Sequence, residues 1–157
     1  MTSVFPAFPR FVFTVLEPIS LIAGAVAPFV SPEWFIAEQT PKASLQLASA
    51  NARVVAYQLG NIYLLLAMVG IAVLYSTTEP KVVRNYVVAL WIADIGSHVA
   101  ITCYNIEYAE LVNFAEWNPM TWGNIGATVA LFLTRTAYLL GIFGPNRQAA
   151  LISKKLQ

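Results

Sequence analysis

Apolar residues fill four long windows of the chain, and turn-forming or polar residues separate them. The windows lie at about 11–30, 54–76, 82–104 and 121–144. A membrane-spanning helix needs about 20 mostly apolar residues, so each window is long enough to cross a bilayer. The pattern predicts an all-α protein in which residues 1–157 form a single transmembrane domain, an integral membrane four-helix bundle.

Composition supports a membrane protein and argues against other classes. Hydrophobic residues make up 58 % of the chain and charged residues only 11 %, whereas soluble domains carry about 25 % charged residues. Such a chain cannot cover a normal water-facing surface, which excludes a soluble enzyme and a disordered protein. The net charge of +1 gives no basis for binding nucleic acid. We therefore expect the lipid bilayer as a partner and no nucleic acid.

Residues that usually hold metals or redox groups are scarce. Cys103 is the single cysteine and His98 the single histidine. A zinc or haem site cannot be built from these two residue types alone, and the chain has no glycine-rich phosphate loop. We therefore expect no metal and no cofactor.

Basic residues are distributed unevenly between the two sides that four spans would create. The side with both termini holds Arg10, Lys81, Arg84, Arg147, Lys154 and Lys155. The opposite side holds Lys42 and Arg53. The positive-inside rule then predicts that both termini are cytosolic. Lys154 and Lys155 also resemble the dilysine retrieval signal of endoplasmic-reticulum membrane proteins, with a simple stop-transfer charge pair as the alternative.

Charged and amide side chains interrupt the apolar windows. They include Glu17, Asn61, Asp94, His98, Asn124 and Arg135. An ionisable residue near the bilayer centre costs about 2.5 to 3.5 kcal/mol on insertion scales. These side chains are therefore expected to face one another or a wet cavity inside the bundle.

Helical spacing places these residues on one stripe of each window, which we expect to face inward. The stripes are Phe13, Glu17, Leu21 and Gly24; Tyr57, Gln58, Asn61, Leu65 and Met68; Val87, Trp91, Asp94, His98, Ile101 and Asn105; and Thr121, Asn124, Thr128, Leu131, Arg135 and Tyr138. Substrate-binding candidates on these stripes are Asn61, Asn124, Trp91, Tyr57, Tyr138 and Met68. Ordinary packing or hydrogen bonding between helices is the alternative role for each of them.

Depth in the bilayer narrows the catalytic candidates. A helix rises about 1.5 Å per residue, which places Glu17, Asp94 and Arg135 in one layer. His98 then lies about one turn closer to the side opposite the termini. One arginine can hold one carboxylate ionised, so the second carboxyl is expected to carry a proton. Two carboxyl groups in opposite protonation states are typical of acid–base catalysis.

Pro18 follows Glu17 directly and should distort the first span. Proline has no backbone N–H and clashes with the carbonyl four residues earlier, here that of Thr14. The Thr14 carbonyl is therefore expected to lose its helical partner beside Glu17.

Several short motifs resemble those of small fungal four-helix membrane proteins from polyketide and meroterpenoid pathways. They are Glu17-Pro18, Trp117-Asn118-Pro119, Trp122-Gly123-Asn124, and Arg135 followed by Gly141-Ile142-Phe143-Gly144. Members of that group with an assigned role open epoxides, as in the membrane epoxide hydrolases of the aurovertin and citreoviridin type. A more distant likeness is to the four-helix sterol isomerase family.

The leading hypothesis is a cofactor-independent membrane enzyme that opens an epoxide on a hydrophobic substrate, by hydrolysis or cyclisation. Glu17 and Asp94 are the acid and base candidates, either way round, with Arg135 or His98 orienting them. One alternative is a structural ion pair between Asp94 and Arg135. Others are a non-catalytic protein that binds a sterol or lipid, a sterol isomerase-like protein, and a structural or channel subunit, with a homo-oligomer as a further possible assembly.

Overall fold

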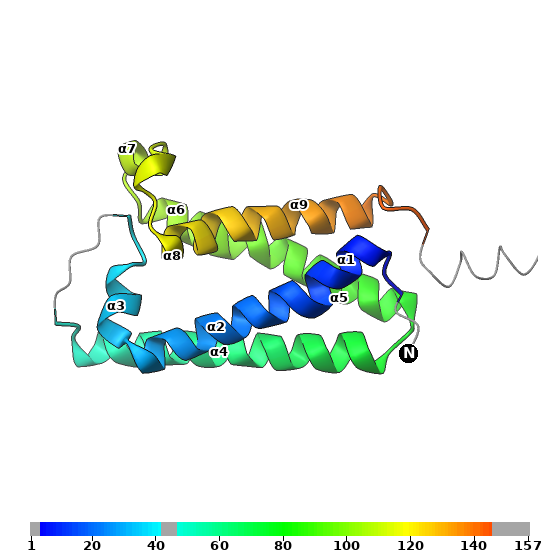
Figure 1. The fold of residues 1–157 in the computed structure, drawn as a ribbon, viewed down its shortest axis with the longest axis horizontal. Helices are drawn as coiled ribbons and strands as arrows, with labels where there is room; N and C mark the ends of the chain where they lie inside the picture. Colours follow the sequence, from blue (N-terminus) through cyan, green and yellow to red (C-terminus); the bar gives the residue numbers. More distant parts are fainter. Residues whose placement is uncertain (1–3, 42–46, 146–157) are drawn as a thin grey trace, which may run out of the picture.

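The computed structural model describes residues 4–41 and 47–145, and this part of the chain is helical without a strand. Four long helical segments run alongside one another (Figure 1). The first joins α1 (Ala7–Phe11), η1 (Val12–Leu16) and α2 (Glu17–Val30), and the second is α4 (Ala50–Ser76). The third joins α5 (Pro80–Ala93), η2 (Asp94–Val99) and α6 (Ala100–Tyr104). The fourth joins α8 (Pro119–Thr121), η4 (Trp122–Ala127) and α9 (Thr128–Leu139).

Short helices occupy the loops at one end of these segments. They are α3 (Pro32–Ala37), α7 (Tyr108–Leu111) and η3 (Phe114–Glu116). Figure 1 shows them at the end opposite the start of α1 and the end of α9, which lie at the same end of the molecule. The described chain therefore begins and finishes at one end.

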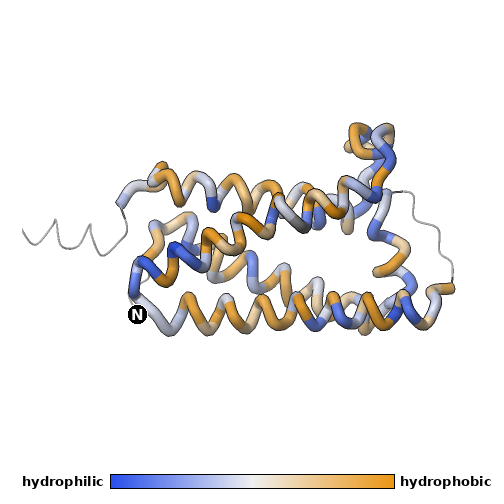
Figure 2. Tube along the Cα trace, turned by 180° about the vertical axis from the view of Figure 1, so that it is seen from behind, coloured by the Kyte–Doolittle hydropathy of each residue, from blue (hydrophilic) through white to orange (hydrophobic). Residues whose placement is uncertain are grey.

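Three of the long segments are long and apolar enough to cross a membrane, namely Ala7–Val30, Ala50–Ser76 and Pro80–Tyr104. Apolar residues dominate their lengths, as the hydropathy colouring shows (Figure 2). The fourth segment is not among them. Asn124, Arg135 and four threonines make it more polar than the others. The described chain is therefore an all-helical protein with three candidate membrane-spanning helices.

α2 packs closely along α4 because α4 presents small residues to it. A Cβ added at Gly60 would lie 2.7 Å from Cγ of Pro28 and 2.9 Å from the Ala25 carbonyl oxygen. The buried residues of α4 are Ala56, Gly60, Ala67 and Gly70. Small side chains let helix backbones approach closely in a membrane. Gly60 therefore permits the close approach of α2 to α4, whereas a Cβ at Gly70 would meet the Tyr86 hydroxyl of α5.

This small-residue face corrects the stripe expected for the second span. Gln58, Asn61, Leu65 and Met68 are exposed rather than inward-facing. Tyr57 is half-buried, and its ring stacks on Phe29 with centroids 5.1 Å apart. The inward face of α4 is therefore chosen by close backbone packing and not by its polar side chains.

Short π-helical stretches interrupt three of the four long segments. They are η1, η2 and η4. A π turn adds a residue and rotates everything after it around the helix axis, and such turns are common at functional sites. After η2, Ile101 and Asn105 are exposed, although they were expected on the same face as Asp94 and His98. The change of register at η2 explains this difference.

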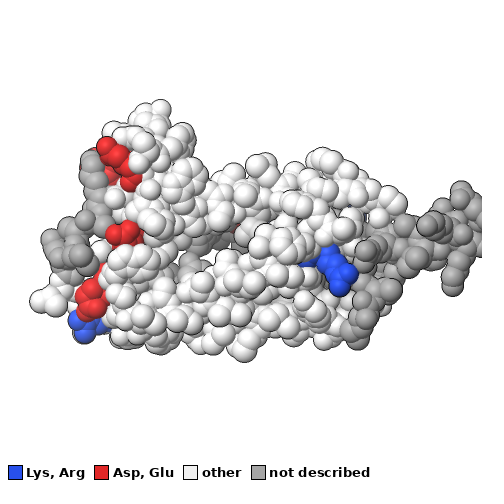
Figure 3. All heavy atoms as spheres, in the orientation of Figure 1, with Lys and Arg blue, Asp and Glu red and all other residues white. Residues whose placement is uncertain are grey.

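Charge separates along the length of the molecule. Figure 3 shows acidic side chains gathered at the end that carries α3 and α7, with one basic patch beside them, and another basic patch toward the end where α1 and α5 begin. The candidate retrieval signal at Lys154 and Lys155 lies outside the described residues, as do Lys42 and Arg147. The charge asymmetry is therefore carried by Arg10, Lys81 and Arg84 among the described basic residues at that end.

Candidate functional site

Arg135 joins the carboxylates of two other long segments in the interior. Its Nη2 donates a hydrogen bond to Oε1 of Glu17 at 2.5 Å, and its Nη1 donates to Oδ2 of Asp94. The Arg135 side chain is only 1 % exposed. Both contacts are charge-assisted hydrogen bonds, which are stronger than neutral ones. The depth argument from the sequence predicts this meeting of Glu17, Asp94 and Arg135, and the structure brings the three together.

Irregular backbone positions both carboxylates. Glu17 follows the π-helical stretch η1 directly, and Asp94 is the first residue of η2. The Thr14 carbonyl accepts a hydrogen bond from the Tyr75 hydroxyl of α4 at 3.2 Å. This contact agrees with the expectation that Pro18 leaves the Thr14 carbonyl without its helical partner. A side chain of the neighbouring helix thus stabilises the distorted turn that carries Glu17.

The carboxylates keep an accessible edge that the guanidinium lacks. Their side chains are 9 % exposed for Glu17 and 11 % for Asp94, against 1 % for Arg135. Within 4–41 and 47–145, only one oxygen of each carboxylate has a hydrogen bond, and its donor is Arg135. The second oxygen of each carboxylate has no hydrogen bond there, but it is not fully buried. The second oxygen of each carboxylate therefore keeps some accessible surface, whereas the guanidinium is sealed.

Aromatic side chains cover Arg135 on the side of the termini. The Phe13 ring centroid lies 5.5 Å from Cζ of Arg135, a cation–π contact. Tyr138 meets Phe13 and Phe5 edge to face, with centroids 6.3 and 5.0 Å away. Tyr138 therefore contributes to the aromatic packing around the cluster.

Trp91 is also engaged within the protein. Its indole Nε1 donates a hydrogen bond to Oγ1 of Thr136 at 2.8 Å, and its ring stacks on Phe132 at 5.3 Å between centroids. These contacts tie α5 to α9. They support the packing role that was the alternative for this residue.

A second polar group lies toward the far end of the molecule. Asn124 is buried, donates to Oε1 of Gln39 at 3.1 Å and shares a side-chain hydrogen bond with His98. The His98 ring lies 6.5 Å from that of Tyr63 on α4. This network brings together His98 and Asn124, two of the predicted site residues.

Gln39 is the member of this network that sequence reasoning missed. It follows α3 in a loop outside the apolar windows, so hydropathy gives no reason to select it. Asn118 fixes the same loop by donating to the Glu38 and Thr40 carbonyls at 3.1 and 2.9 Å. Among the motifs noted in the sequence, Trp117-Asn118-Pro119 is therefore one that contacts the loop containing Gln39.

A known family model covers this entire arrangement. The model of DUF7704, described as a domain of unknown function, matches residues 2–145. The chain belongs to this family. No curated protein and no solved structure matches the chain. The DUF7704 match spans Glu17, Asp94 and Arg135 without assigning them a role.

Three of the predicted site residues of this DUF7704 protein lie apart from the ion cluster. Asn61 and Met68 are exposed on α4, and Tyr57 stacks on Phe29. In the described ranges, none of the three makes a polar contact or ring contact with Glu17, Asp94 or Arg135. The cluster, with His98 and Asn124 in the neighbouring network, is the part of the predicted site that the fold assembles.

Proposed function

We propose that this protein is a cofactor-independent membrane enzyme that opens an epoxide on a hydrophobic substrate of the polyketide or meroterpenoid type in fungal secondary metabolism. The observation that carries the proposal is the pair of carboxylates on Arg135, each with one oxygen left accessible. Epoxide opening needs a proton donor at the ring oxygen and a base at the nucleophile. A buried pair of carboxyl groups can supply both.

The proposed step balances without any further reactant. Asp94 takes a proton from water as the water oxygen attacks one epoxide carbon. The carbon–oxygen bond of the ring breaks, and Glu17 gives a proton to the ring oxygen. A proton transfer from Asp94 back to Glu17 then resets the pair, and the product is a vicinal diol. In cyclisation, a hydroxyl of the substrate replaces water.

Charge balance in the cluster supports these protonation states. One guanidinium offsets one carboxylate, and an uncompensated buried charge would cost several kcal/mol. The cluster is therefore most stable with one carboxyl ionised and the other neutral. Arg135 orients both groups because it donates to each of them through a different nitrogen.

The setting in the membrane suits a lipid-soluble substrate. We propose that the segment at 119–139 crosses the bilayer as a fourth span, so that the four long segments form a membrane bundle with both termini cytosolic. The excess of basic residues at the end where the described chain begins and finishes supports this orientation. We also propose residence in the endoplasmic reticulum, so that a hydrophobic substrate reaches the cluster from the surrounding lipid.

Activity measurements on variants test the proposal. Microsomes containing the protein are incubated with a panel of polyene and prenyl epoxides in heavy-oxygen water, and products are analysed by mass spectrometry. Hydrolysis adds one labelled oxygen to the product, whereas cyclisation adds none. Glu17→Gln and Asp94→Asn should each reduce turnover by about 100-fold or more, since general acid–base catalysis contributes about 10²–10⁴-fold.

Glu33→Gln is the matched control because Glu33 pairs with Arg53 outside the cluster. This variant should keep full turnover. All three variants should accumulate to similar levels, because glutamine and asparagine preserve side-chain shape. Turnover that survives in both cluster variants on a verified substrate would refute the catalytic assignment and leave a structural ion cluster or a lipid-binding pocket.

A further inference from the structure

A pocket opens at the basic end of the molecule, and Glu17, Asp94 and Arg135 are not among its lining residues. Its volume is about 470 Å³, which is within the usual range of about 300–1,000 Å³ for small-molecule sites. It is lined by Lys81 and Arg84 of α5, Tyr138 and Leu139 of α9, and Gly141 and Gly144. Phe13 contacts both Arg135 of the cluster and Tyr138 of the pocket lining.

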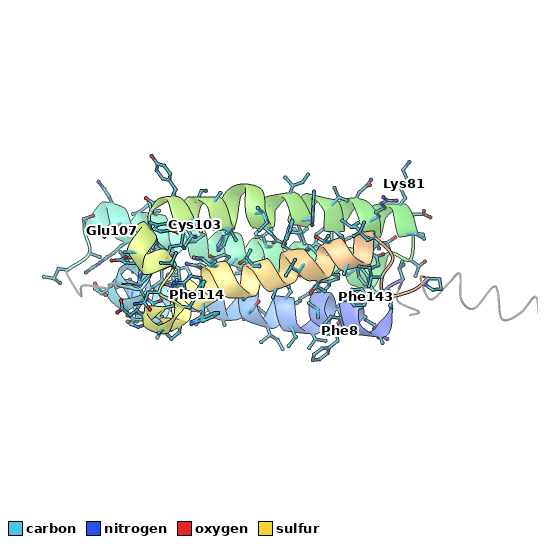
Figure 4. All side chains as sticks on the ribbon, turned by 90° about the horizontal axis from the view of Figure 1, so that it is seen from above. Phe8, Lys81, Cys103, Glu107, Phe114 and Phe143 are labelled. Carbon is cyan, nitrogen blue, oxygen red and sulfur yellow. The ribbon has the colours of Figure 1, made fainter. Side chains whose placement is uncertain are left out.

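The charge of this pocket is positive. Two of its lining side chains are basic, and neither Asp nor Glu is among the described residues that line it. Glu79 precedes α5 but does not line the pocket. Figure 4 shows Lys81 at the same end as Phe8 and Phe143. The pocket also borders the first turn of α5, where the helix macrodipole places positive partial charge.

Unpaired backbone carbonyls at the end of α9 would repel an anion, but residues of the following turn donate hydrogen bonds to three of these carbonyls. Leu140 donates to the Thr136 carbonyl, Ile142 to that of Ala137 and Gly141 to that of Tyr138, each at 3.0 Å. Three of the backbone acceptors at this end are therefore already used. Negative partial charge at the pocket is correspondingly reduced.

Glycine keeps the wall of the pocket open. Gly141 and Gly144 have positive φ angles of 76° and 86°, which favour glycine. A Cβ built at either position would meet no atom within 4 Å, so there is free space beside both residues. Lys81 and Arg84 are one helical turn apart on α5 and can reach one ligand from the same side.

We propose that this pocket binds a phosphate group. An anionic group would be attracted by the two cations on one face of α5 and by the positive end of that helix. The pocket volume exceeds what a single ion needs, which fits an anionic group attached to a larger molecule. The pocket lies where the candidate span Pro80–Tyr104 begins and the fourth long segment ends, a position where a phospholipid headgroup would be found. A free phosphate shares the same chemistry. The proposal does not depend on epoxide chemistry.

Binding measurements on the full-length protein in neutral detergent test this. Short-chain phosphatidic acid, short-chain phosphatidylcholine and inorganic phosphate are titrated separately, and affinity is followed by microscale thermophoresis. The protein should bind phosphatidic acid or inorganic phosphate, and the double variant Lys81→Gln/Arg84→Gln should weaken that binding by about tenfold or more, because charge-assisted contacts are lost. Binding of phosphatidic acid alone identifies a lipid headgroup, and binding of inorganic phosphate as well identifies a free anion.

Two further variants separate the pocket from general charge effects. Arg10→Gln removes a basic residue at the same end that does not line the pocket, and it should leave affinity within about twofold, as expected for a screened surface charge. Lys81→Arg/Arg84→Lys preserves both charges and should retain binding. The proposal is overturned if neither phosphatidic acid nor inorganic phosphate binds, or if phosphatidylcholine, whose phosphate carries no net charge with its choline, binds equally well. It is also overturned if the glutamine double variant, with unchanged helical circular dichroism, binds like the native protein.

Discussion

Arg135 is suited to its place because a guanidinium offers several donors in a fixed plane. One terminal nitrogen serves Glu17 and the other serves Asp94. A lysine ammonium is a compact point charge without this fork, so it would not hold two carboxylates at defined positions. The identity of this one side chain therefore determines the geometry of both acids.

Removing Arg135 should leave two buried carboxyl groups without their cation. Breaking a buried ion pair by removing one partner costs about 3–5 kcal/mol, so Arg135→Leu should lower the free energy of unfolding by about that amount. Adding Glu17→Gln and Asp94→Asn to this variant should restore much of the loss, because no charge then remains unpaired. Unfolding in mixed micelles, followed by circular dichroism, measures both steps. A triple variant no more stable than Arg135→Leu would show that charge pairing is not what Arg135 contributes.

At the residue scale, the energetics of charge in lipid made the cluster predictable from sequence. Glu17, Asp94 and Arg135 share a depth, and buried charges must pair, so their meeting followed from spacing alone. Asn61 lies in a similar pattern but faces outward. Exposing a neutral amide to lipid costs less free energy than exposing a charge, so Asn61 does not dictate the orientation of its helix. Gln39 was not predictable, since its role depends on how a loop folds over η4.

At the scale of the helix, glycine and alanine on α4 decide how the elements pack. Sequence hydropathy located all four long segments, but it could not orient α4, whose buried face is made of small residues rather than large ones. The π-helical stretches were also missed. No side-chain pattern marks a single extra residue in a turn, and yet η2 and η4 contain Asp94, His98 and Asn124.

Gly60→Ala should destabilise the protein through the α2–α4 contact. The new Cβ would lie 2.9 Å from the Ala25 carbonyl oxygen, which cannot move without shifting backbone. Overpacking of this kind costs about 1–3 kcal/mol. Gly123→Ala is the control, since a Cβ there meets nothing within 4 Å. Thermal unfolding of the purified variants measures both, and equal stability of the two would contradict close packing at Gly60.

At the scale of the whole molecule, two features of the fourth segment give opposite indications of whether it crosses the membrane. Its polar character argues against a crossing, and its position alongside the other long segments favours one. Asn124 and Arg135 lower its hydropathy, but both are buried against other helices rather than facing outward. Polar residues that face the interior of a bundle do not have to enter lipid. The segment can therefore cross a membrane as part of the assembled protein although its sequence is less apolar than those of the other three.

Cysteine labelling measures this crossing directly. With Cys103→Ser as background, single cysteines are placed at three exposed positions by Lys81→Cys, Asn113→Cys and Ile142→Cys. In sealed microsomes, a membrane-impermeant maleimide should label Lys81→Cys and Ile142→Cys, because the proposed topology puts both in the cytosol. Asn113→Cys should react only after permeabilisation. If Asn113→Cys and Ile142→Cys react under the same condition, the segment between them does not cross the bilayer, and the four-span arrangement with both termini on one side is incorrect.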